Sequence, residues 1–197
     1  LQPSRLRRDI VLDRIELETE RLNTLIGQLL TMARVDSGVG LERWGVFDIA
    51  ALVDEVATDA EYEARPRGCA VAVAGERNCL VSGSADLVRG AVENVVRNAV
   101  RHTADGTRVD ISLERRAAAG GPAVVISVRD RGPGVPDKIV SRLFVPFYRG
   151  LHTDNNQNGT GLGLAITRRV LEVHGGTATA ANADGGGFVV ALELPLY

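Results

Sequence analysis

The chain has 197 residues, of which 45% are hydrophobic and 24% are charged, a composition typical of a folded globular protein rather than a disordered one. A formal net charge of −2 and an aromatic content of 4% argue against nucleic acid as the main partner, because such partners need basic surfaces and stacking side chains. The sequence has no uninterrupted apolar run of the length that a membrane helix needs, about 18 residues or more.

The first predicted element is one long helix over residues 9–36. Apolar residues recur there mostly at spacings of three and four, with one gap of seven, and charged residues fill the opposite face. A helix of this length without a core of its own needs partner helices, unless it folds back onto its own domain. The apolar stripe comprises Val11, Leu12, Ile15, Leu22, Leu25, Ile26, Leu29, Met32 and Ala33.

Ser37 and Gly38 end this helix, and a linker is expected at residues 39–44. Beyond the linker, helices and strands alternate irregularly, and several strands pair as hairpins. This order predicts an α/β fold: a two-layer α/β sandwich with a mixed sheet and helices on one face, preceded by the long helix. Strands are predicted at 44–48, 70–74, 79–82, 108–115, 123–130, 177–183 and 188–194, and helices at 49–65, 84–102, 137–143 and 162–174.

The two cysteines, Cys69 and Cys79, do not form a C-x-x-C pair and have no histidine cluster around them. Their position in a β-rich stretch predicts two free, buried thiols.

Three separated segments carry the candidate chemistry. In the first, Asn94, Asn98 and Arg101 lie on one face of the helix predicted over 84–102, at i, i+4 and i+7. Two amides and a cation in one row suit a polyanion with a metal, and Asn98 can offer its side-chain carbonyl to Mg²⁺. Taken alone, a polar helix face is usually a solvated surface.

The second segment, Asp130-Arg131-Gly132-Pro133-Gly134, follows a predicted strand directly. A carboxylate there can accept a hydrogen bond from an exocyclic amine, and glycines let a ligand approach the backbone, although a plain turn has the same composition. The third segment is Gly159-Thr160-Gly161-Leu162-Gly163 at a helix start, where free N–H groups favour phosphate. It is neither a P-loop nor a dinucleotide fingerprint.

In this order the segments resemble the Bergerat ATP-binding fold of the gyrase, Hsp90, histidine kinase and MutL superfamily. They are similar to its N box, first glycine box and second glycine box, and residues 143–149 resemble the F box of histidine kinases. The likeness covers residues 45–197. Residues 1–38 resemble the second helix of the kinase dimerization hairpin. The Arg-Asn-Ala, Pro-Phe-Tyr-Arg and Leu-Pro-Leu-Tyr runs are similar to Cpx-type envelope-stress sensor kinases.

The resemblance implies that ATP and Mg²⁺ bind here. It places the adenine amine on Asp130, Mg²⁺ on Asn98, and Arg149 at the γ-phosphate or the partner helix. His102 lies beside the adenine or ribose in this interpretation, whereas His152 and His174 are structural. The residues assigned to the nucleotide are Asn94, Asn98, Arg101, His102, Asp130, Gly132, Gly134, Gly159, Thr160, Gly161, Leu162 and Gly163.

One position distinguishes a kinase from a hydrolase. Members of the superfamily that hydrolyse ATP carry a glutamate four residues before the Mg-binding asparagine, and here that residue is Asn94. An amide cannot accept a proton from water at neutral pH. The expected function is therefore transfer of the γ-phosphoryl group to a histidine and then to a response-regulator aspartate. The alternatives are a degenerate binding module and an ATP-gated clamp or hydrolase.

The family's phosphoacceptor box, H-E-x-x-x-P, does not surround any histidine of this chain, so autophosphorylation is not expected. The resemblance implies a homodimer through the hairpin and a cognate response regulator as partner. It also implies a cytoplasmic portion of a bacterial inner-membrane sensor kinase, tethered through segments outside this sequence.

Overall fold

The computed structural model describes residues 3–37, 44–118, 120–148 and 160–197. A five-stranded sheet with the strand order β2-β4-β5-β7-β6 forms its centre. β2 is parallel to β4, and the other neighbours are antiparallel, so the sheet is mixed as predicted. The strands are β2 (Ala70–Gly75), β4 (Arg108–Ala118), β5 (Gly121–Arg129), β6 (Thr177–Asn182) and β7 (Phe188–Pro195).

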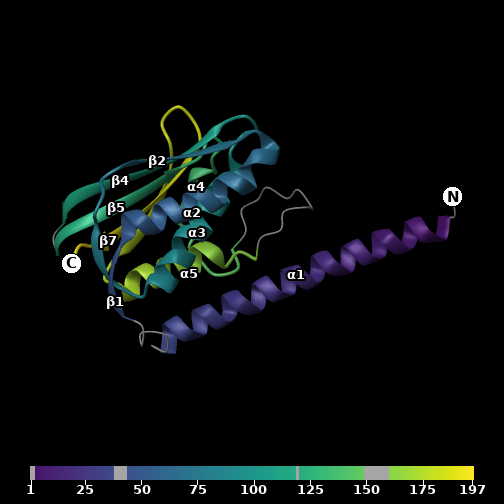
Figure 1. The fold of residues 1–197 in the computed structure, drawn as a ribbon, viewed down its shortest axis with the longest axis horizontal. Helices are drawn as coiled ribbons and strands as arrows, with labels where there is room; N and C mark the ends of the chain where they lie inside the picture. Colours follow the sequence, from purple (N-terminus) through teal and green to yellow (C-terminus); the bar gives the residue numbers. More distant parts are fainter. Residues whose placement is uncertain (1–2, 38–43, 119, 149–159) are drawn as a thin grey trace.

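Three helices cover one face of this sheet (Figure 1). They are α2 (Ile49–Ala64), which continues into the short 3-10 turn η2 (Arg65–Arg67), α3 (Ala85–His102) and α5 (Gly163–Val173). α3 packs between α2 and α5, and its buried face consists of small and β-branched residues that allow close approach to the sheet. The predicted two-layer α/β sandwich is therefore confirmed.

Two local features differ from the sequence-based expectation. β1 (Gly45–Asp48) and β3 (Leu80–Gly83) form a separate two-stranded antiparallel sheet. The Asp48 carboxylate accepts the N–H groups of Ala50 and Cys79, both at 3.0 Å, so one side chain caps α2 and anchors the start of β3. The helix predicted over 137–143 is shorter, because α4 (Asp137–Val140) ends in successive turns.

Cys69 and Cys79 are free and buried, as the sequence predicted. Within the described segments, none of the helices combines the length and the apolar character that crossing a bilayer requires.

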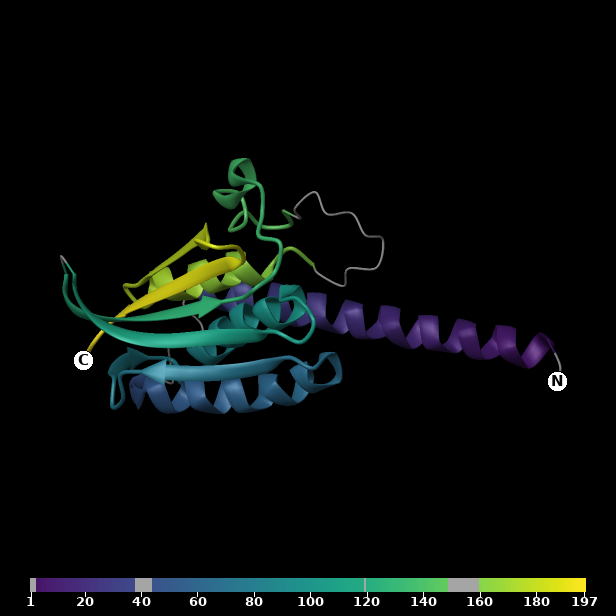
Figure 2. The same ribbon diagram turned by 90° about the horizontal axis from the view of Figure 1, so that it is seen from above.

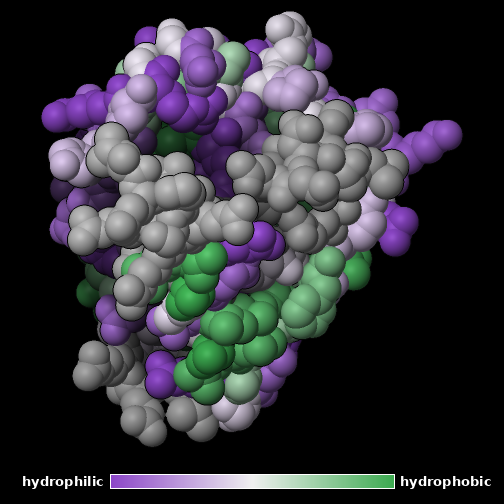
Figure 3. Space-filling model, turned by 90° about the vertical axis from the view of Figure 1, so that its right-hand side faces the viewer, coloured by the Kyte–Doolittle hydropathy of each residue, from purple (hydrophilic) through white to green (hydrophobic). Residues whose placement is uncertain are grey.

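α1 (Pro3–Ser37) is a 35-residue helix that projects from the domain, with its N-terminal end farthest away (Figures 1 and 2). Its C-terminal part contacts α5: Val35 is only 4% exposed, and Asp36 forms an ion pair with Arg169 at 2.7 Å. The predicted stripe is largely exposed along the projecting part, and Figure 3 shows hydrophobic side chains gathered on this side of the molecule. Its large exposed members are Val11, Leu12, Ile15, Leu22, Ile26 and Leu29, and Leu30 beside them is exposed as well.

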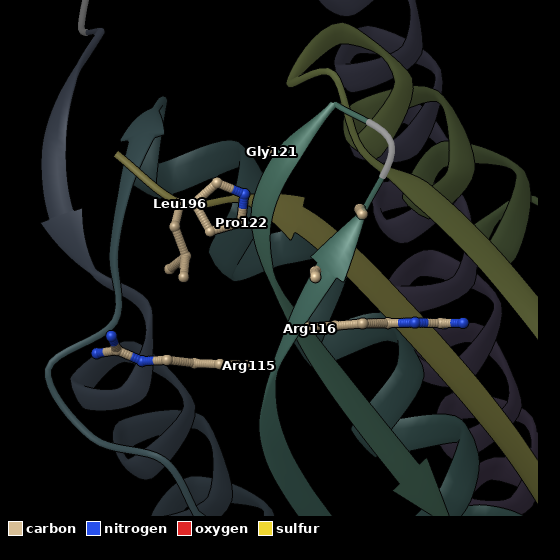
Figure 4. Close-up of a pocket in the computed structure, with 7 residues that line it drawn as sticks. Arg115, Arg116, Gly121, Pro122 and Leu196 are labelled. Carbon is tan, nitrogen blue, oxygen red and sulfur yellow. The ribbon is translucent and has the colours of Figure 1, made fainter.

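A hollow of about 460 Å³ lies beside the turn between β4 and β5 (Figure 4). Its two arginines point to opposite sides of β4 and are already ion-paired, Arg115 with Glu76 at 3.5 Å and Arg116 with Glu193 at 3.8 Å. The hollow lies at the start of β5, whereas the candidate residue Asp130 follows the end of that strand.

Candidate active site

α3 presents the predicted row of polar side chains. Val92, Val95 and Val96 are at most 1% exposed and face the core, whereas Asn94 and Asn98 are half-buried on the other side. This division follows from the helical period, which separates residues one or two positions apart onto different faces. The two amides therefore lie at the boundary between the core and the surface, where a ligand can reach them.

Asp130 lies immediately after β5 and is only 6% exposed. Its Oδ1 atom accepts the N–H groups of Gly132 at 2.8 Å and Phe188 at 3.2 Å. Burial raises the pKa of this carboxyl, whereas the two amide hydrogen bonds and then the charge of His102 oppose the rise. Because these two hydrogen bonds use Oδ1, Asp130 is held as an oriented acceptor.

The end of α3 packs directly against the first glycine box. A Cβ atom on Gly132 would lie 2.2 Å from the carbonyl oxygen of His102, which is far inside van der Waals contact. The N–H of Arg131 also donates to Oγ1 of Thr103 at 3.1 Å. The structure therefore brings the predicted N box and the first glycine box together, and glycine is required at position 132.

The far side of the same loop is held by a residue that the sequence analysis missed. The Asn182 amide oxygen accepts the N–H of Val135 at 2.9 Å, and its nitrogen donates to the carbonyl of Val135 at 2.7 Å and to Asp137 at 2.8 Å. Gly134 has a φ of +70°, and a Cβ atom there would lie 2.7 Å from the Asn182 oxygen. No local pattern could have revealed Asn182, since it is 47 residues from Val135.

The second glycine box meets the N box from the other direction. A Cβ atom on Gly163, the first residue of α5, would lie 3.4 Å from the Asn94 side-chain oxygen. Gly161 has a φ of +73°, and a Cβ atom there would approach the backbone of Phe147 to 2.9 Å. Thr160 accepts the N–H of Leu162 at 3.3 Å and donates to Gln28 of α1 at 2.5 Å.

Two predicted residues, Gly159 and Arg149, lie outside the described residues, as does His152. Leu162 is described, but its side chain is fully buried in the hydrophobic core, so only its backbone can face a ligand. Arg101 and His102 are exposed at the end of α3. Loss of hydration beside the neighbouring chain, and then the like charge of Arg97, lower the pKa of Arg101, which stays protonated at neutral pH.

His174 has the surroundings of a structural residue. It is 6% exposed and stacks on Trp44, with ring centroids 4.8 Å apart. Nε2 accepts the N–H of Ser84 at 2.9 Å, and Nδ1 lies 2.7 Å from the carbonyl oxygen of Val170. Ser84 occupies the predicted N-cap of α3, but its side chain makes no capping hydrogen bond.

The side chains near α3 suit a Mg²⁺ ion that is bound mainly by phosphate oxygens, rather than a metal ion that is held by protein ligands alone. Within the described segments, no group of three or more His, Cys, Asp or Glu residues could hold an ion. Mg²⁺ accepts a single protein oxygen readily when waters and phosphate oxygens complete its octahedral shell. The half-buried Asn98 amide fits that requirement.

Comparisons with known proteins agree with this geometry. The model of the family described as "Histidine kinase-, DNA gyrase B-, and HSP90-like ATPase" matches residues 83–197. The chain is 33% identical over 188 residues to the sensor histidine kinase CpxA of Escherichia coli, covering 94% of this chain and 40% of CpxA. It is 32% identical over 182 residues to the sensor protein kinase PmrB of Pseudomonas aeruginosa, covering 92% and 37%. These similarities are comparable, so they do not place the chain in the Cpx-type subgroup.

Solved structures give the same result. Full-length ShkA in complex with AMPPNP aligns over all of this chain and 40% of its own, with 27% identity and a TM-score of 0.76. The catalytic domain of histidine kinase ThkA aligns over 78% of this chain and 97% of its own, with 25% identity and a TM-score of 0.67. The chain spans about two fifths of the length of its curated relatives. It belongs to the histidine kinase-, DNA gyrase B- and HSP90-like ATPase family, and within that family it is similar to the catalytic portion of sensor histidine kinases.

Proposed function

We propose that this chain binds Mg-ATP and donates the γ-phosphoryl group to a histidine outside the sequence, from which it passes to a response-regulator aspartate. The observation that supports this most directly is the convergence of three segments. The end of α3 contacts the loop after Asp130, and the middle of α3 contacts the start of α5. An acceptor carboxylate, two amides and a helix N-terminus thus surround one side of α3.

In this proposal each group has a distinct task. The buried Asp130 carboxylate accepts the adenine amine, and Gly132 and Gly134 shape the pocket beside it. Asn94 and Arg101 lie near the phosphates, and His102 lies beside the adenine or ribose. The remaining backbone contacts come from Gly159, Thr160, Gly161, Leu162 and Gly163.

Asn98 is proposed to hold Mg²⁺ through its amide oxygen, and Arg149 to stabilise the γ-phosphate or contact the partner helix. When bound there, Mg²⁺ would supply positive charge that offsets the charge of the phosphate oxygens during transfer of the γ-phosphoryl group. The residues of this chain bind and orient the nucleotide, which is the main protein contribution to phosphoryl transfer.

A phosphoryl donor that spares ATP from water is favoured over a hydrolase. Asn94 stands where hydrolytic relatives need a base, and Glu93 is turned about 100° away around the helix. Arg89, one helical turn before Glu93, donates a hydrogen bond to Glu55 of α2. Residues four apart share a helix face, so Glu93 lies on the side of α3 that packs on α2.

The exposed stripe of α1 supports a dimerization hairpin. Ile15 and Leu22 are 56% and 58% exposed, and a helix with such a face is stabilised by partner helices. We propose residues 1–38 as the second hairpin helix, 39–44 as a linker and 45–197 as the catalytic domain. Homodimerization, the response regulator and a cytoplasmic position at the inner membrane belong to the whole protein in this proposal.

The test is calorimetric titration of the chain with Mg-ADP beside the Asp130→Asn variant. The parent is expected to bind in the micromolar range, as an order of magnitude. The variant should bind at least about tenfold more weakly, or about 1.4 kcal/mol, because the amide replaces one acceptor lone-pair edge by a donor.

A folded parent that does not bind Mg-ADP would refute the proposal and favour the interaction-module alternative. Measurable hydrolysis of ATP by the isolated chain would instead revive the hydrolase alternative. Supplying a separate histidine-bearing hairpin helix should allow phosphoryl transfer only when Asp130 is intact.

A further inference from the structure

Arg67 makes an unusual set of contacts for a surface arginine. Its guanidinium donates to the carbonyl oxygens of Val100 at 2.7 Å, Arg101 at 3.0 Å and Thr103 at 2.7 Å. The same group donates to the Asp105 carboxylate at 2.7 Å. Arg67 lies in η2, more than 30 residues before these partners, so the contacts tie two separate elements together.

These carbonyls are the ones that a helix leaves unsatisfied. α3 ends at His102, and the last four carbonyls of a helix lack intrahelical partners. Many helices close with a left-handed glycine, but Thr103 is extended, with φ −61° and ψ 147°. Two of the open carbonyls, those of Val100 and Arg101, are satisfied by Arg67 instead. A positive charge is also favourable at this end of the helix dipole.

The turn that Arg67 holds is the one that meets the first glycine box. The carbonyl of His102 lies against Gly132, closely enough to exclude any Cβ atom there. Thr103 accepts the N–H of Arg131, and the N–H of Ala104 donates to the carbonyl of Arg131 at 3.4 Å. A shift of this turn therefore moves the loop that begins at Asp130.

We infer that Arg67 is a positioning residue for nucleotide binding. It acts through α3 by fixing the last helical turn, with Arg101 and His102, against the glycine loop. Neither a sequence motif nor the ligand contacts proposed above include it. The inference rests on the proposed nucleotide site, which the Asp130→Asn titration tests separately.

The experiment compares Mg-ADP affinity of the parent, Arg67→Gln and Arg65→Gln by calorimetry at a temperature where all are folded. Arg65 is a matched control, because it lies in the same turn and carries the same charge, and its side chain makes no hydrogen bond or ion pair within the described segments. Arg67→Gln is expected to weaken binding about fivefold to tenfold, the scale of losses at residues that orient direct ligands. Arg65→Gln should stay within about twofold of the parent.

A general loss of stability is separated by Val56→Ala, a core change in α2 at a residue that is 2% exposed. Its melting temperature should fall while its Mg-ADP affinity stays at the parent value. If Val56→Ala weakens binding as much as Arg67→Gln does, the inference is overturned.

Two further outcomes are decisive. If the parent and Asp130→Asn behave as proposed but Arg67→Gln binds like Arg65→Gln, only the role of Arg67 falls. If the parent does not bind, both proposals fall.

Should Arg67→Gln not fold, the Arg67→Lys variant decides. Lysine keeps the charge but cannot reach three carbonyls at once, so a loss of Mg-ADP affinity of about threefold to fivefold is expected. Unchanged affinity overturns the inference.

Discussion

Replacing His174 by phenylalanine is expected to lower the free energy of unfolding at pH 7.5 by about 2–4 kcal/mol. Phenylalanine keeps a ring of similar shape on Trp44, so the stacking remains. It removes the acceptor for the N–H of Ser84, a residue that is 3% exposed. An unsatisfied buried amide costs about 1–3 kcal/mol, and the lost bond to the Val170 carbonyl adds about 1 kcal/mol.

The same residue predicts a pH dependence with a definite sign. Burial lowers the pKa of His174 below its usual value, although the hydrogen bond to Val170 opposes this. The unfolded chain therefore binds the proton more readily, and the contribution of His174 to stability is complete above about pH 6.5. It is lost as the pH falls from that value toward the lower folded pKa. Protonation would also aim an Nε2 hydrogen at the Ser84 N–H.

Urea unfolding of the parent and of His174→Phe between pH 5 and 8 measures both effects. Trp44 is the only tryptophan of the chain, so its fluorescence reports directly on the stacked pair. The parent should lose stability relative to the variant as the pH falls, and Trp44 emission should titrate in the parent alone. Equal pH slopes in both proteins, or a difference at pH 7.5 below about 0.5 kcal/mol, would refute the reasoning.

Three other outcomes follow from contacts described above. Gly187→Ala should destabilise the fold by about 2 kcal/mol or more, because its Cβ would lie 2.1 Å from the carbonyl oxygen of Asp130. Gly90→Ala should stabilise the fold by about 0.5–1 kcal/mol, because this helical site has no atom within 4 Å of the added Cβ. Thermal melts of the two variants and the parent measure both effects. Asp130→Asn should leave the nucleotide-free chain equally stable or more stable at pH 7, since burial raises the pKa of the carboxyl and its charged form is disfavoured; a clear loss in urea unfolding would contradict this. Replacing Ile15 and Leu22 together by glutamine should reduce any self-association seen by sedimentation equilibrium, whereas an unchanged mass distribution would show that the stripe is not used.

The sequence was sufficient for the parts of this fold that repeat regularly. The period of α3 separated Val92, Val95 and Val96 from Asn94 and Asn98, and the structure confirms that division. Helix and strand positions followed in the same way, because burial of one face imposes a local period. The ordered glycine boxes identified the family for a similar reason, since each box is a continuous segment.

Contacts between distant segments could not be predicted. Arg67 and Asn182 act 33 and 47 residues away from their partners, and no local pattern distinguishes either residue from its neighbours as one that makes such contacts. The separate pairing of β1 with β3 also depends on where the chain turns in space rather than on either strand alone. α4 is shorter for another reason: the N–H groups of Arg142 and Leu143 donate to the carbonyls three residues before them, so residues 141–143 form turns rather than a further α-helical turn.

The position of β7 has a consequence for the newborn chain. Phe188, the first residue of β7, supplies one of the two amides that hold the Asp130 carboxylate, and its carbonyl accepts the Asp130 N–H at 3.0 Å. A nascent chain that has left the ribosome only as far as α5 already contains every glycine box, yet its Asp130 still lacks both hydrogen bonds to Phe188. Because synthesis proceeds from the N-terminus, nucleotide can assist folding only after the last strand has emerged.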